Sequence, residues 1–144
     1  MAIENEHIRQ RLQRVIEESR RGARERRARA EAAADDGERL LRQVVAPMFR
    51  QMAHVLKAEG HLFRVSTPKE AVQLVAEGPG ENRIELAVDT TVDPPTLQSR
   101  VVRTRGRRVL VDETVVRTGD AIASMTDEAT LEFLLAAIPP FVEK

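Results

Sequence analysis

Arginine is the residue type in this chain whose spacing could most readily do chemistry, by holding phosphate or another anion. Only Lys57, Lys69 and Lys144 among the 23 basic residues are Lys, so the rest are Arg. The planar guanidinium presents a fork of donors that matches two oxygens of a phosphate or carboxylate. Two clusters stand out: Arg20, Arg21, Arg24, Arg26, Arg27 and Arg29, and then Arg100, Arg103, Arg105, Arg107 and Arg108.

These clusters support an interpretation as nucleic-acid contacts, but other features of the composition weaken it. The formal net charge is zero, and the four Phe residues are the only aromatic side chains available to stack on bases. No known nucleic-acid-binding motif is present. An Arg-rich and Ala-rich composition is also typical of GC-rich bacterial genomes. We therefore keep nucleic-acid binding as an alternative function.

Catalytic groups are scarce in this sequence. It contains no Cys, Trp or Tyr, and its three His residues lack the spacing of a metal site. No Ser lies in a nucleophile motif, and no glycine-rich phosphate loop occurs. Asp89 and Asp93 could divide acid and base roles, but Asp at a strand end more commonly favours a turn. We expect a protein that is not an enzyme and has no metal or cofactor.

Length and composition fit one domain, or one small domain with an appendage. The chain has 144 residues, of which 42% are hydrophobic and 32% charged, and its mean hydropathy is −0.36. No apolar run approaches the roughly 20 residues that span a bilayer, and the first residues lack the apolar stretch of a signal peptide. We expect a bacterial cytoplasmic protein without a membrane partner.

Residues 1–60 have the composition of a helical arm, because Glu, Arg, Ala, Gln and Leu are strong helix formers. We expect helix over 3–34 and again over 38–59, with a break or weak point near 35–37. Pro47 should kink the second helix, and Gly60 should cap its end in a left-handed conformation.

Apolar or small residues recur in this arm at steps of three and four, which marks one stripe along a helix. Bulky side chains lie at its two ends and small ones between Ser19 and Ala34, so a long regular leucine zipper is not expected. An isolated helix in water is marginal, so the arm should pack on its own copy or on another protein. The expected interface residues are Ile8, Leu12, Val15, Ile16, Leu41, Val44 and Met48. The alternative is that the first helix folds back on the second.

Residues 61–144 form a small head, in which the period changes from helical to alternating. Strands are expected over 61–66, 71–76, 83–89, 99–104 and 107–116. Arg105-Gly106 should be a two-residue hairpin turn, and 67–70 a turn rather than a helix start. Such a succession of short strands predicts an antiparallel meander.

A closing helix should complete the head. Thr126 is its expected N-cap, Leu131, Leu134, Leu135 and Ile138 its apolar stripe, and Pro139-Pro140 its end. The fold class is therefore α+β, with a helical arm, a meander of about five strands and a closing helix. The function that fits best is a scaffold or adaptor, which self-associates through the arm and binds a partner with the head.

Overall fold

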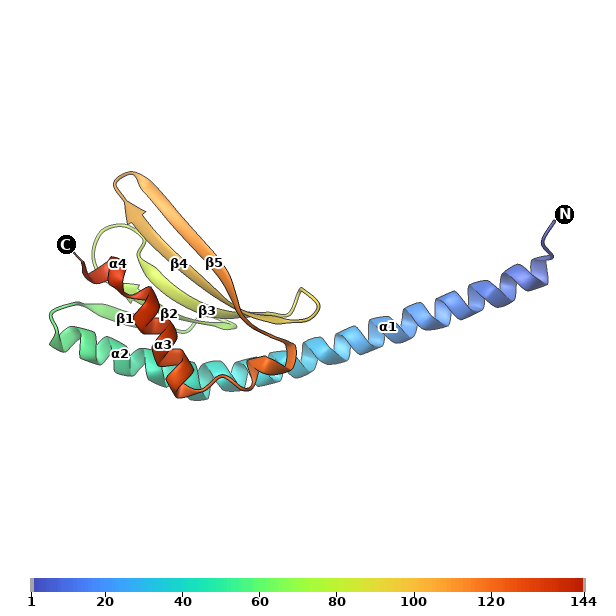
Figure 1. Cartoon of the computed structure of the whole chain (residues 1–144), viewed down its shortest axis with the longest axis horizontal. Coiled ribbons are helices and arrows are strands. Elements are labelled where there is room, and N and C mark those ends of the chain that lie inside the picture. The colour runs from blue at the N-terminus through green and yellow to red at the C-terminus, as the bar shows by residue number, and fades with distance from the viewer. Residues whose placement is uncertain (1, 144) are drawn as a thin grey trace.

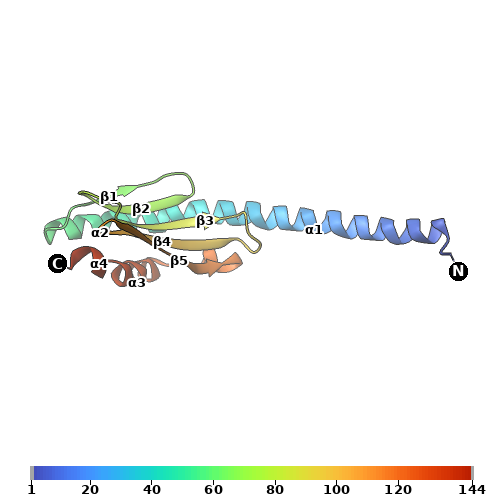
Figure 2. The same ribbon diagram turned by 90° about the horizontal axis from the view of Figure 1, so that it is seen from above.

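The computed structural model describes residues 2–143 and shows the expected α+β fold. One long helix runs the length of the molecule. The sheet and the closing helix are gathered around its C-terminal part, and its N-terminal part stands alone (Figure 1; Figure 2). The helix does not fold back on itself, which excludes the helical hairpin considered above.

The long helix consists of α1 (Asn5–Leu40), a π-helical turn (Leu41–Val45) and α2 (Ala46–Ala58). The π turn ends at Val45, two residues before Pro47, in the region where a kink was expected. Pro47 has no N–H to donate, and its ring crowds the preceding turn, so a local widening of the helix is a usual accommodation. Gly60 caps the end as expected, with φ of 90°. Its N–H donates to the Lys57 carbonyl over 3.0 Å.

The expected interruption at 35–37 is absent, because α1 continues through Gly37 to Leu40. Gly37 is buried, and a Cβ placed there would lie 2.6 Å from Cγ2 of Val88 in the sheet. The glycine therefore permits close packing of helix on strand and does not end the helix.

The five strands form an antiparallel meander in chain order: β1 (Phe63–Ser66), β2 (Ala71–Ala76), β3 (Arg83–Asp89), β4 (Thr96–Arg105) and β5 (Arg108–Thr118). Residues 67–70 form a turn, as expected. The β4–β5 turn lies one residue later than expected, at 106–107, because Arg105 pairs with Arg108. Gly106 there has a φ of 63°, which glycine adopts without strain.

One face of the sheet forms the core with the helices. Ile84 and Leu86 of β3 are fully buried together with Phe49 of α2 and Leu134 of the closing helix. Alternation along β3 places its charged residues on the other face. The head is thus a sheet covered on one side by the C-terminal end of α1, the π turn, α2 and the closing helix.

The closing helix is α3 (Asp127–Ala137), and Thr126 caps it by accepting a hydrogen bond from the Ala129 N–H over 3.1 Å. Leu134 and Ile138 are buried, but Leu135 is 56% exposed and does not belong to the expected stripe. The prolines both end α3 and begin a short helix, α4 (Pro139–Val142), since proline is well suited to a first helical turn.

Candidate functional site

The N-terminal part of α1 is the most exposed element of the molecule. Every side chain from Ala2 to Arg21 is exposed, and the first buried residue of the helix is Ala33. We call residues 5–28 the overhang, and at 1.5 Å per residue it extends about 36 Å. Figure 1 shows it projecting beyond the sheet with no other element beside it.

Four large apolar side chains lie on this overhang, and we call them the arm quartet. Ile8 is 48% exposed, Leu12 54%, Val15 61% and Ile16 38%. Their spacing of three and four residues places them on one side of the helix. A contiguous apolar stripe of this kind on an otherwise charged helix is typical of a surface that packs against another helix.

The arm quartet lies on the same side of α1 as the surface that packs on the sheet. At about 100° per residue, Ile8, Leu12 and Val15 lie within roughly 40° of the direction of Gly37 around the helix axis. Ser19, Ala23 and Ala30 continue the same line between them. This side of the helix therefore runs from the free end, across small residues and the exposed Arg26, into the core of the head, and only its second half is covered.

The other three expected interface residues belong to the head. Leu41 is only 5% exposed and contributes to the core, while Val44 and Met48 are partly buried against it. The helical stripe in this region is explained by packing on the sheet of the same chain. Packing also assigns helix residues from Ala33 onward to the head, so the head extends N-terminal to the change of pattern at residue 60.

Arg29, which directly follows the overhang, contacts Asp93 of the head. Arg29 donates from Nε and Nη2 to the two carboxylate oxygens of Asp93, over 3.2 and 3.0 Å. These hydrogen bonds and the opposite charge hold the pKa of Asp93 below its usual value and raise that of Arg29. Sequence reasoning missed this contact, because Arg29 and Asp93 are 64 positions apart and neither carries a local signal of the other.

The other arginines of the first cluster surround the overhang. Arg20, Arg21, Arg24, Arg26 and Arg27 are all exposed. None of them forms an ion pair with another side chain in residues 2–143. Their charge is therefore available to a partner.

The second cluster lies around the β4–β5 hairpin. Arg100 pairs with Glu113 on the neighbouring strand over 3.5 Å, and Arg103 is half-buried. Arg105, Arg107 and Arg108 are exposed at the turn. Figure 1 shows this turn at the end of the sheet remote from the overhang, so the two clusters do not form one continuous basic surface.

The residues considered for acid–base or metal chemistry do not come together. Asp89 accepts a hydrogen bond from the Thr91 N–H over 2.8 Å, which is the turn role expected of it. The Thr91 hydroxyl also donates to Asp89 and, as the larger effect, lowers its pKa. Asp93 is engaged by Arg29. No group of three His, Asp or Glu within residues 2–143 could hold a metal ion.

A cleft of about 540 Å³ lies between the long helix and the β1–β2 turn. Charged side chains of both signs line it, and Arg42 there pairs with Glu38 over 3.4 Å. Leu41 and Val88 supply apolar surface, whereas no Ser or His lines it. The volume is in the range of ligand-binding clefts, so it is a candidate binding surface of the head, and we assign no reaction to it.

Comparison of the chain with protein-family models, with curated proteins and with solved structures finds no match. Among the described residues, no helix combines the length and the apolar character required to cross a membrane. Functional inference for this chain therefore depends on its own geometry.

Proposed function

We propose that this chain is a non-enzymatic scaffold or adaptor that self-associates through the overhang and presents the head to a further partner. The observation that carries the proposal is the arm quartet, four large apolar side chains that no other part of the chain covers among the described residues. An isolated helix is marginally stable in water, and helices in proteins gain most of their stability from packing an apolar face. A second copy of the chain carries the same apolar stripe and is present at the same concentration as the first.

The magnitudes favour weak, concentration-dependent association. Burying a fully exposed Leu, Ile or Val contributes about 1.5–3 kcal/mol, so a half-exposed side chain contributes roughly 1 kcal/mol. Two quartets together contribute roughly 8 kcal/mol, which is comparable to the estimated 4–15 kcal/mol cost of association. At the low end of that cost the surplus is about 4 kcal/mol, which corresponds to a dissociation constant on the order of 1 mM. We therefore expect a weak dimer that forms at high protein concentration.

Size-exclusion chromatography with light scattering tests this proposal over a series of protein concentrations. The variant Leu12→Glu/Val15→Glu places two charges on the stripe and should remain monomeric where the wild type dimerises. Gln10→Glu/Gln13→Glu adds the same charge on the outward side of the same helix and should associate like the wild type. A monomeric wild type at all concentrations, or equal effects of both variants, would contradict the proposal.

Nucleic-acid binding remains the second candidate, because five exposed arginines on the overhang form no ion pair with any residue in 2–143. The chain has no Trp or Tyr and absorbs little in the near ultraviolet. Absorbance at 260 nm in the same chromatography would therefore reveal bound nucleic acid clearly. Strong absorbance that disappears after a high-salt wash would favour this second function.

A further inference from the structure

We infer that two copies pair through their overhangs in antiparallel orientation, with Leu12 of each helix packed against the partner's Val15. This inference rests on the proposed self-association and adds the orientation and register of the pair. It follows from the distribution of large, small and charged residues along the exposed stripe.

Side-chain size is distributed unevenly along the stripe. We call the line along which the two helices would meet the seam. Its bulky residues are Ile8, Leu12 and Val15, and the next positions at the same spacing, Ser19 and Gly22, are small. In the antiparallel register, the large Ile8 packs against the partner's small Ser19 at each end of the contact. Leu12 and Val15 of the two copies pack on each other in its centre. An in-register parallel pair would place Gly22 on the partner's Gly22 and leave a gap in the seam.

Charge along the stripe distinguishes the two orientations further. Arg26 continues the line of Ile8 around the helix axis, within the cluster of six arginines over 20–29. An in-register parallel pair would bring these clusters together, and like charges in close contact are destabilising. The antiparallel register instead brings the acidic residue Glu4 close to the partner's arginine cluster.

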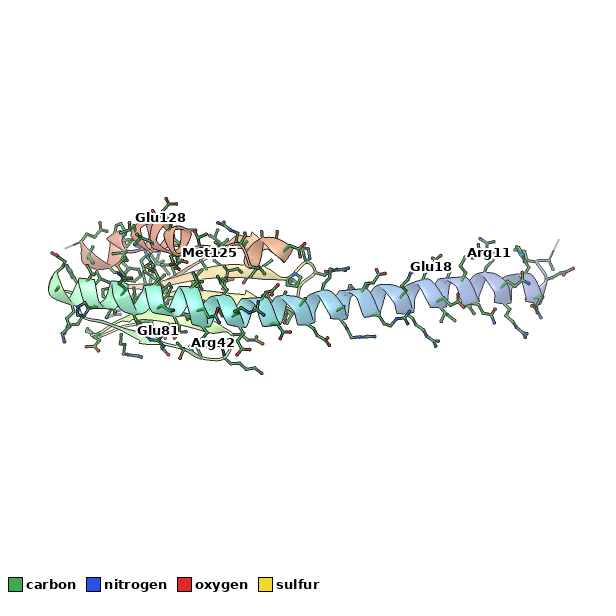
Figure 3. All side chains as sticks on the ribbon, turned by 90° about the horizontal axis from the view of Figure 1, so that it is seen from below. Arg11, Glu18, Arg42, Glu81, Met125 and Glu128 are labelled. Atoms are coloured by element: carbon green, nitrogen blue, oxygen red, sulfur yellow. The ribbon has the colours of Figure 1, made fainter. Side chains whose placement is uncertain are left out.

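Two charges beside the seam complement each other only in the antiparallel pair. Arg11 and Glu18 are exposed, seven residues apart, and project from the same side of the overhang (Figure 3). Neither forms an ion pair within residues 2–143. Facing flanks of antiparallel helices bring Arg11 level with the partner's Glu18 to within about two residues, or 3 Å along the axis. Because the pairing is symmetric, this contact occurs twice.

The position of the head agrees with the same orientation. The sheet lies on the side of α1 that carries the arm quartet, so parallel pairing would direct both heads into the same space. In the antiparallel register the overlap covers about 18 residues, or 27 Å. The partner's Ile3 then lies level with Arg24, just short of the Arg29–Asp93 contact where the head begins. The overhang is therefore long enough for the overlap, and the two heads lie at opposite ends of the pair.

Disulfide trapping tests the orientation, since the chain has no cysteine of its own. The single variants Ile8→Cys and Ser19→Cys are oxidised separately and as an equimolar mixture. In the antiparallel register each Cys lies about 16 Å along the axis from its own copy, beyond the reach of a disulfide. We expect a covalent dimer only in the mixture, linking one variant to the other.

The outcomes separate this inference from the proposed function. Cross-linking of each variant to itself would show a parallel pair and overturn the inference. If light scattering shows that the oxidised mixture is dimeric but no cross-link forms, the helices meet in another register. That outcome would also overturn the inference. A wild type that is monomeric throughout would instead refute self-association, and the inference with it.

Charge reversal gives an independent readout in the full-length chain. Arg11→Glu alone, or Glu18→Arg alone, should weaken dimerisation several-fold, because each places like charges face to face twice. The double variant Arg11→Glu/Glu18→Arg exchanges the charges and should restore the wild-type dissociation constant to within about twofold. If the double variant dimerises as weakly as expected from adding the effects of the two single changes, Arg11 does not face the partner's Glu18.

Discussion

Gly37 of α1 packs against Val88 of β3, and its lack of a side chain permits this close approach of helix and sheet. We predict that Gly37→Ala destabilises the head, because the new Cβ would lie 2.6 Å from Cγ2 of Val88. Overpacking of a core typically costs about 1–3 kcal/mol, and alanine returns up to about 1 kcal/mol of helix propensity. A net loss of about 1–2 kcal/mol in urea unfolding, followed by circular dichroism, is expected.

Gly22 provides the matched control for this substitution. It lies on the same helix, but a Cβ there would meet only the end of the Arg26 side chain, at 3.3 Å. Gly22→Ala should therefore stabilise α1 and leave the unfolding of the head unchanged. Equal effects at Gly22 and Gly37 would show that helix propensity alone, without contact to the sheet, determines the response.

Asp93 should titrate abnormally because Arg29 holds it. Its pKa is lowered in the folded protein, first by the Arg29 hydrogen bonds and then by the positive charge nearby. A lowered folded pKa means that the contact stabilises the fold above the ordinary carboxyl pKa of about 3.9. That stabilisation is lost as the pH falls through the folded pKa.

The variant Arg29→Gln tests this titration. We predict that it raises the pKa of Asp93 towards the ordinary value, as followed by NMR of the side-chain carboxyl carbon. Arg26→Gln is the control, since Arg26 contributes only a weaker charge effect and no hydrogen bond. An Asp93 pKa that is the same in wild type and Arg29→Gln would contradict the contact.

Among the elements, α3 depends on a cap that can be removed by one substitution. Thr126 Oγ1 accepts the Ala129 N–H over 3.1 Å, and loss of such a cap typically costs about 1 kcal/mol. Thr126→Ala should lower the free energy of unfolding by that amount, whereas Thr126→Ser should retain most of it. Urea unfolding of the three proteins measures the difference, and equal values for Ala and Ser would contradict the role of the cap.

The elements also show which features a sequence can predict. Strands β2 and β3 were predicted with their observed bounds, because alternation with one buried face is a local signal. The turn at 106–107 was placed one residue early, since arginines on both sides carry no apolar pattern that determines the pairing. The distortion of the helix near Pro47 was predictable, because a proline acts on the helix that contains it. The role of Gly37 was not, because it depends on a strand 51 positions later.

At the scale of the whole molecule, the candidate site was only partly predictable. Helical spacing identified the arm quartet, and all four of its side chains, Ile8, Leu12, Val15 and Ile16, are exposed to solvent in the structure. Leu41 has the same spacing but is buried in the head. Helical periodicity shows which face of a helix is apolar. It does not show how much of that face the sheet covers, which here depends on the fold of the head beyond the contact between Arg29 and Asp93.

Truncation at two points separates the overhang from the head. Removal of residues 2–27 should abolish self-association and reduce the helical signal in circular dichroism, because it removes the arm quartet. The thermal midpoint of the remaining protein should stay close to that of the wild type, since every side chain up to Arg21 is exposed and the first buried residue of the helix is Ala33.

Removal of residues 2–40 is the informative contrast, because it also takes Ala33, Gly37 and Leu40 from the core. Leu40 is only 4% exposed, and deleting one buried leucine side chain to alanine already costs about 2–5 kcal/mol. The longer deletion should therefore leave no cooperative thermal transition. A large loss of stability in the shorter deletion would mean that the overhang stabilises its own head. The arm quartet would then serve the fold of one chain, and there would be no reason to expect it to join two.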